Sequence, residues 1–225
     1  RQSLHFKQLF DSIKFFEFNN LYHEHISYGT LNDSDGNPFK TREGGTKPLS
    51  ELFEETYQYI KNINSDLEDS TIKQLANSVL TFSDLITNRK TDYKFDLEKF
   101  TNVNGKTGLY VQYAQVRAKK LKQSIGLQKN EFDLLVLSDI DKHLLSLLFM
   151  FGYYLEQSSS LNEPHHLANY LYDISNSFNQ FYEHEKLSEI KDSNHLNSKL
   201  YLIDLFLTTS KNVMFCLGIK PVERM

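Results

Sequence analysis

Residues 107–122, TGLYVQYAQVRAKKLK, place two tyrosines and several cations at helical spacing. At about 100° per residue, Tyr110, Tyr113, Arg117 and Lys120 fall within an arc of roughly 80° on one helix face. Aromatic rings that stack unpaired bases, with cations nearby for phosphate, are typical of proteins that hold single-stranded RNA loops. The same residues also fit two boundary tyrosines beside a solvated basic face, so both interpretations stay open.

A second candidate stretch is the loop GNPFKTREGG, residues 36–45. Lys40 and Arg42 lie two residues apart in it, with glycines on both sides. Glycines let a backbone approach a ligand closely, and paired cations can neutralise phosphate charge that develops in a transition state. A polar turn with incidental charges is the alternative.

The histidine pairs do not predict a metal site. His23 and His25, and likewise His165 and His166, lack a thiolate partner and the i, i+4 spacing of a zinc-binding helix. Cys216, the one cysteine, lies in the apolar run NVMFCLGI and is expected to pack in the core. A lone cysteine also fits a reducing, cytoplasmic compartment, because it cannot form an internal disulfide.

Composition limits the function classes. The chain has 225 residues and a formal net charge of -4, which disfavours binding of nucleic acid through overall charge. A local basic patch could still bind. No run of about 18 apolar residues occurs, so no membrane span is expected.

Apolar residues recur at helical spacing along most of the chain, and the elements that must position these side chains are therefore helices. Helices are expected over 3–18, from about 50, over 70–88, 109–125 and 139–155, from 162 with Asn162 as its cap, and over 195–217. A strand is expected near 23–31, and 89–108 is expected to be a long connection.

Several stretches together resemble one family. They are RQSLHFKQLF, SDGNPFKTREGG, FDLEKFTNVNGKTGLYVQYAQVRAKKL, PHHLANYLYDISNSFNQFY and LGIKPVERM, in this order. Together they resemble the arginyl-tRNA synthetases. The combination of TG-x-Y-x-QYA-x-x-R with a P-x-ERM end is the most specific part of the match.

The resemblance implies a mainly α chain, in which a helical anticodon-binding bundle follows the end of a Rossmann-type α/β catalytic domain. The expected division is a catalytic remnant at 1–50, a helical connection at 51–105 and the anticodon-binding domain at 106–225. Lys40, Thr41 and Arg42 match the mobile KMSKS loop that stabilises the ATP phosphates. The residues expected to bind tRNA, Lys120 from the helical arc and the others by resemblance, are Tyr110, Gln112, Tyr113, Arg117, Lys120, Tyr182 and Met225.

The sequence also departs from the family pattern. Leu109 replaces a usual proline, Lys199 replaces a usual arginine, and Pro38 and Phe39 precede Lys40. The HIGH motif of class I synthetases would lie upstream of Arg1. The 225-residue chain is therefore expected to be an inactive C-terminal fragment of the enzyme.

The resemblance implies an ATP-dependent arginine–tRNA ligase that works through an arginyl-adenylate. Its expected partners are arginine, ATP with Mg²⁺ and tRNA-Arg, with no tightly bound cofactor and no membrane. The protein is expected to be a cytoplasmic monomer. The alternative is a non-enzymatic helical module that binds RNA or protein. Another class I synthetase is disfavoured by the P-x-ERM end.

Overall fold

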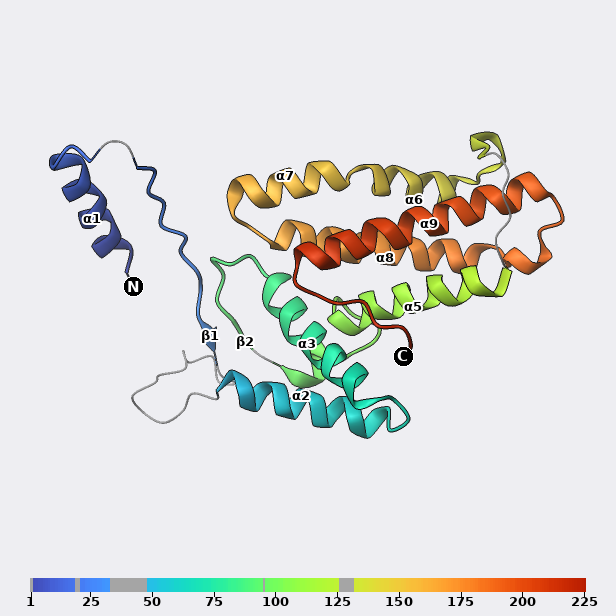
Figure 1. Ribbon diagram of the computed structural model, residues 1–225, viewed down its shortest axis with the longest axis horizontal. Coiled ribbons are helices and arrows are strands. Elements are labelled where there is room, and N and C mark those ends of the chain that lie inside the picture. The colour runs from blue at the N-terminus through green and yellow to red at the C-terminus, as the bar shows by residue number, and fades with distance from the viewer. Residues whose placement is uncertain (1, 19–20, 33–47, 95, 126–131) are drawn as a thin grey trace.

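The helical spacing of apolar residues produces a chain that is almost all helix. The computed structural model describes residues 2–18, 21–32, 48–94, 96–125 and 132–225 (Figure 1). The helices are α1 (Ser3–Phe15), α2 (Leu49–Ile63), α3 (Asp69–Leu85), α4 (Leu97–Phe100), α5 (Gly108–Ile125), α6 (Asp139–Phe149), α7 (Phe151–Leu161), α8 (His165–His184) and α9 (Ser193–Cys216). Two 3-10 turns, η1 (Leu134–Val136) and η2 (Leu187–Glu189), and two strands, β1 (Leu31–Asn32) and β2 (Tyr93–Lys94), complete the described elements.

Helices α5 to α9 form a bundle around an aromatic core. Figure 1 shows α6 and α7 following one another along one side, with α8 and α9 in the middle and α5 on the other side. Phe178 of α8 stacks on Phe206 of α9 with ring centroids 4.3 Å apart. Such a pair adds about 0.5–1.5 kcal/mol beyond the burial of its area. The bundle confirms the expected fold of this part of the chain.

A second, smaller core joins α2 and α3 to the start of α5 and to the chain end, where Leu109, Val116 and Val222 contribute to it. Helix α5 approaches α3 so closely at Gly108 that a Cβ on this residue would overlap the backbone carbonyl of Ser78. A side chain at residue 108 would therefore push the two helices apart. The close approach thus positions the N-terminal end of α5, and with it the helix face that carries the tyrosines, relative to α3.

The N-terminal part contributes little regular structure to the described fold. The expected strand near 23–31 is paired only at β1, where Leu31 lies opposite Tyr93 of β2 in a parallel ladder. Figure 1 shows α1 standing apart from the bundle. None of the residues of α1 is buried, and Phe15 is 81% exposed. The apolar stripe of α1 thus packs against no core within the described residues.

Three expectations about the bundle were wrong. The single helix expected over 139–155 is two helices, α6 and α7, which meet at Met150. Asn162 caps the C-terminus of α7 with a φ of 52°, a left-handed conformation that asparagine tolerates, and α8 begins only at His165. Cys216 is exposed, because Met214 and Leu217 occupy the inward positions at the end of α9.

Within the described residues, no helix is long and apolar enough to cross a membrane.

Candidate nucleic-acid interface

A hollow of about 350 Å³ lies between α5, α8 and the chain end. A neighbouring hollow of about 520 Å³ continues along the same face of α5. The first is lined by Tyr113, Val116, Arg117, Lys120, Leu121, Ser124, Tyr182 and Met225. The second shares Tyr113, Arg117 and Met225 and adds Asn64, Val103, Asn104, Tyr110, Asn176, Asn179, Gln180 and Glu183. The structure therefore brings six of the seven residues expected to bind tRNA to one continuous surface.

Arg117 organises this surface. Its guanidinium carbon lies 4.5 Å from the ring centroid of Tyr113 and 4.5 Å from that of Tyr182. The guanidinium also donates hydrogen bonds to the Tyr113 hydroxyl and to Oδ1 of Asn179, each at 2.9 Å. Cation–π contact and hydrogen bonds together hold the two rings in place before any ligand arrives.

The tyrosines differ in exposure. Tyr113 is 40% exposed and Tyr182 is 38% exposed. Tyr110 is only partly exposed, because its ring packs against Tyr172 at a centroid distance of 5.2 Å and its hydroxyl donates to Oδ1 of Asn176 at 3.2 Å. Burial raises the pKa of Tyr172, and the nearby Tyr110 adds to that shift. Tyr113 and Tyr182 are thus the better platforms for stacking.

Gln112 is the expected tRNA-binding residue that the structure places elsewhere. It is fully buried, because it lies on the side of α5 that faces α3 and the chain end. Its Nε2 donates to Oγ of Ser78 at 2.8 Å and to the carbonyl of Lys220 at 2.7 Å, and its Oε1 accepts from the backbone N–H of Val222 at 3.0 Å. Gln112 therefore positions the segment that ends in Met225, and it has no surface with which to contact RNA.

The charge on this surface is partly compensated by neighbouring carboxylates. Nη1 of Arg117 lies 3.8 Å from a carboxylate oxygen of Glu183, and Nζ of Lys119 lies 2.8 Å from Oε1 of Glu223. Lys120 is exposed, and it forms no ion pair with any residue that the structure describes. The hollows thus combine stacking faces, amide groups that can pair with base edges, and a few cations for phosphate.

A polar face of α8 also lines the second hollow, and its residues were not among those expected from the sequence. Asn176, Asn179, Gln180 and Glu183 recur at i, i+3, i+4 and i+7, which places them on one face of α8. That spacing could have identified them, but a polar helix face is usually only solvated. What distinguishes this face is that Asn176 bonds Tyr110, while Asn179 and Glu183 contact Arg117.

The expected ATP-loop residues lie outside the described structure, and Lys199, which departs from the family pattern, lies away from this surface. Lys40, Thr41 and Arg42 fall in residues 33–47, which lie outside the described residues. Lys199 is fully buried and forms ion pairs with Asp141 at 2.8 Å and with Glu185 at 3.0 Å. It is a core residue of the bundle and does not line the hollows.

One group of side chains among the described residues could hold a metal ion. It consists of Glu163, His165 and His166, at the turn between α7 and α8. The histidine pair lacked a third ligand when the sequence alone was considered, and the structure places Glu163 beside it.

Two protein families match the chain, each over a different part of it. The family described as the DALR anticodon binding domain matches residues 111–225, just over half of the chain. The chain belongs to the DALR anticodon binding domain family. The hollows described above lie mostly within the matched DALR region. The family described as tRNA synthetases class I (R), catalytic domain, matches residues 1–97, so the DALR domain here follows catalytic-domain sequence.

Curated relatives of this DALR-family chain carry one name. The chain is 35% identical over 237 residues to the arginine–tRNA ligase of Alcanivorax borkumensis and 34% identical over 239 residues to that of Francisella tularensis subsp. novicida. Both matches cover 100% of the chain and 41% of the relative. The chain thus spans about two fifths of the length of the relatives that it matches.

Solved structures show the same fold. The Thermus thermophilus arginyl-tRNA synthetase superposes with a TM-score of 0.79 at 23% identity, covering 89% of this chain and 35% of the other. The Plasmodium falciparum arginyl-tRNA synthetase superposes with a TM-score of 0.77 at 24% identity, covering 100% of this chain and 40% of the other. The mainly helical fold expected from the sequence is therefore confirmed.

Proposed function

We propose that this chain supplies the anticodon-binding domain of an arginine–tRNA ligase, together with part of its class I catalytic domain. Such an enzyme uses ATP to join arginine to its tRNA through an arginyl-adenylate. Both curated relatives described above bear this name and match the whole chain. The order of the two family matches along the chain supports the same assignment.

The observation that carries the proposal is the arrangement of Arg117 between the rings of Tyr113 and Tyr182 beside two hollows. An anticodon loop offers unpaired bases with exposed faces and edges, and phosphates close to them. Aromatic platforms, amide groups and cations are the side chains that bind these three features. We therefore infer that the anticodon loop of tRNA-Arg lies across the hollows.

The rest of the assignment is proposed from sequence. Lys40, Thr41 and Arg42 would stabilise the phosphates of ATP, which reacts with Mg²⁺ bound to it. Arginine and ATP would be substrates, with no tightly held cofactor, and the protein would act as a cytoplasmic monomer. The HIGH motif is missing from the 225 residues, so the chain by itself would not catalyse arginine-dependent exchange of pyrophosphate into ATP.

The test is binding of a tRNA-Arg anticodon stem-loop to the 225-residue chain and to Tyr113→Ala. Loss of one stacked base is expected to weaken binding by about 1–3 kcal/mol, roughly 5- to 150-fold in Kd. The measurement is fluorescence anisotropy with a labelled stem-loop.

Tyr153→Ala is the matched control, because Tyr153 is also an exposed tyrosine but lies on α7, which Figure 1 shows on the opposite side of the bundle from α5. Its Kd should equal that of the unchanged chain. An equal Kd for Tyr113→Ala would remove this surface from the proposed function.

A further inference from the structure

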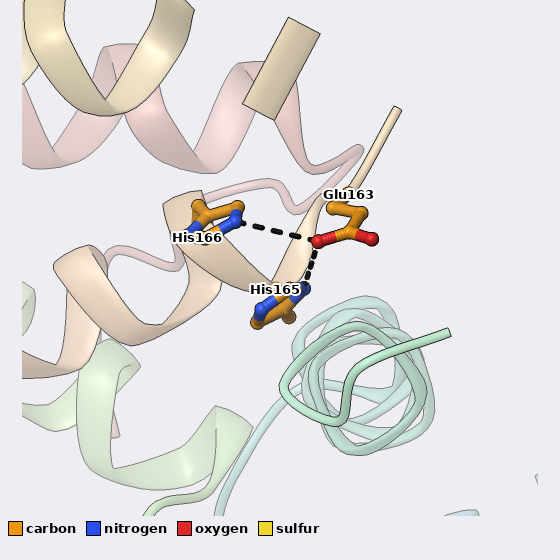
Figure 2. A group of neighbouring side chains, drawn as sticks. All are labelled: Glu163, His165 and His166. Atoms are coloured by element: carbon orange, nitrogen blue, oxygen red, sulfur yellow. Dashed lines mark ion pairs between the residues drawn. The ribbon is translucent and has the colours of Figure 1, made fainter. Parts of the chain in front are cut away.

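The turn between α7 and α8 brings two histidines onto one carboxylate (Figure 2). Nε2 of His166 lies 3.5 Å and Nδ1 of His165 lies 4.0 Å from the same atom, Oε2 of Glu163. The two imidazole rings lie 4.2 Å apart at an angle of 34°. Adjacent residues of a helix usually point about 100° apart, so the convergence of both rings on one oxygen is a property of this turn.

The two facing nitrogens are buried and have no hydrogen-bond partner among the residues that the structure describes. A buried polar atom without a partner costs about 1–3 kcal/mol, and each such atom calls for a physical explanation. A cation bound between the three side chains would satisfy both nitrogens and the carboxylate oxygen at once.

The backbone around the group is held in place by local hydrogen bonds. Asn162 adopts its left-handed conformation, and the N–H of Glu163 donates to the carbonyl of Ser158 at 3.0 Å. Nε of Arg89 donates to the carbonyl of Asn162 at 2.8 Å. Glu163 and the start of α8 therefore do not need to reorganise to bring their side chains together.

We propose that Glu163, His165 and His166 form a binding site for a divalent transition-metal ion, with Zn²⁺ the best fit. Two ligands of a tetrahedral Zn²⁺ lie about 3.4 Å apart, because each bond is about 2.0–2.1 Å long. The separations of 3.5 and 4.0 Å from Oε2 approach that value, and all three candidate ligand atoms lie within 4.8 Å of one another. Two imidazoles with one carboxylate favour Zn²⁺ over Mg²⁺ or Ca²⁺, which prefer oxygen ligands.

The neighbouring charges oppose the ion and so provide a specific test. Nζ of Lys90 lies 2.9 Å from Oε1, the other carboxylate oxygen of Glu163. Its positive charge leaves Oε2 free but repels a cation bound there. Replacement of Lys90 by an uncharged residue should therefore strengthen metal binding at this site and at no other.

The proposed metal site lies where three parts of the molecule meet. Arg89 donates to the carbonyl of Ser27 as well as to Asn162, and Nδ2 of Asn162 donates to Oε2 of Glu24 at 3.1 Å. The turn between α7 and α8 is thus already tied to the segment that follows α3 and to residues 21–30. Zn²⁺ bound to Glu163, His165 and His166 would stiffen the turn on which these hydrogen bonds depend.

The experiment is calorimetric titration of the metal-stripped 225-residue chain with Zn²⁺, in a Cys216→Ser background that removes the one exposed thiol. One equivalent is expected to bind. His166→Ala and Glu163→Gln should each raise the Kd at least about 100-fold, because even partners of metal ligands cost 10- to 100-fold when they are removed. Co²⁺ in place of Zn²⁺ should give visible absorption bands that both variants abolish.

Two further variants distinguish this site from other metal binding. His143→Ala, an exposed histidine on α6, should leave the Kd unchanged, and Lys90→Met should lower it several-fold. Circular dichroism verifies that each variant is folded, and His166→Ala decides the outcome if Glu163→Gln does not fold. Unchanged Zn²⁺ affinity in His166→Ala, or the absence of any one-equivalent binding in the unchanged chain, would overturn the proposal.

Discussion

Arg117 combines two roles that a charge alone cannot fill. Its flat guanidinium contacts the rings of Tyr113 and Tyr182 on their faces, and its N–H groups bond Asn179 and the Tyr113 hydroxyl. A lysine would keep the charge but lose the plane and most of the donors. A substitution of Arg117 that keeps its charge therefore distinguishes its role in orienting the rings from its attraction of phosphate.

At this residue we expect Arg117→Lys to weaken binding of the tRNA-Arg stem-loop by about tenfold, close to 1.4 kcal/mol, because the rings lose their support. The measurement is the same anisotropy titration at fixed salt. Lys120→Arg, which keeps a charge on the same face, is the control and should change little. A Kd for Arg117→Lys within twofold of the unchanged chain would mean that only the charge matters.

Helices α6 and α9 are joined by a buried ion pair. Lys199 of α9 and Asp141 of α6 are both fully buried, and Nζ lies 2.8 Å from Oδ2 of Asp141. Asp141 also accepts from the backbone N–H of Ser138 at 2.9 Å in the capping box that begins α6. The pair thus connects the start of α6 to the second turn of α9, and neither charge can reach water.

At the scale of these elements, Lys199→Met is expected to lower the free energy of unfolding by about 3–5 kcal/mol, because it leaves the Asp141 carboxylate buried without a counter-charge. Urea denaturation followed by circular dichroism measures the change. Lys122→Met is the matched control: it breaks a pair with Asp204 whose side chains are 36% and 46% exposed, and should cost less than about 1 kcal/mol. Equal losses in the two variants would show that the buried pair has no special role.

The 225 residues carry a net charge of -4, so the proposed binding of RNA must depend on local positive charge. Among the described residues, only Arg117 and Lys120 place cations in the lining of the two hollows. Binding of the stem-loop should therefore depend weakly on salt. For two neutralised phosphates on a single strand, the slope of log K against log salt concentration is expected near -1.4.

The measurement for this prediction is the stem-loop affinity between low and moderate potassium chloride concentrations. Lys120→Ala should reduce the steepness of the slope by about 0.7, because one phosphate contact is lost. A slope steeper than about -4 would require a larger basic surface than the hollows provide. In that case the RNA would contact other faces of the molecule.

The helical period placed Tyr110, Tyr113, Arg117 and Lys120 on one face, and the structure has them there. The period could not tell that Gln112 is buried, since the covered side of α5 depends on Ser78 and Lys220. Nor did it find the break at Met150, because apolar residues continue through it and the nearby glycine, Gly152, lies inside α7. Local pattern predicts helices well, but it carries little information about which of their faces meet.

By itself, the sequence determined most of the helices of the bundle and the basic, tyrosine-bearing face of α5, because these depend on residues close together in the chain. It also determined the family, through an ordered set of short motifs. Only the tertiary structure decided that Arg117 lies between Tyr113 and Tyr182, and that Met225 borders the same hollow. The same holds for Glu163, whose carboxylate meets His165 and His166 only because Asn162 turns the chain. These contacts depend on how helices pack and how turns aim side chains, which the spacing of residues does not specify.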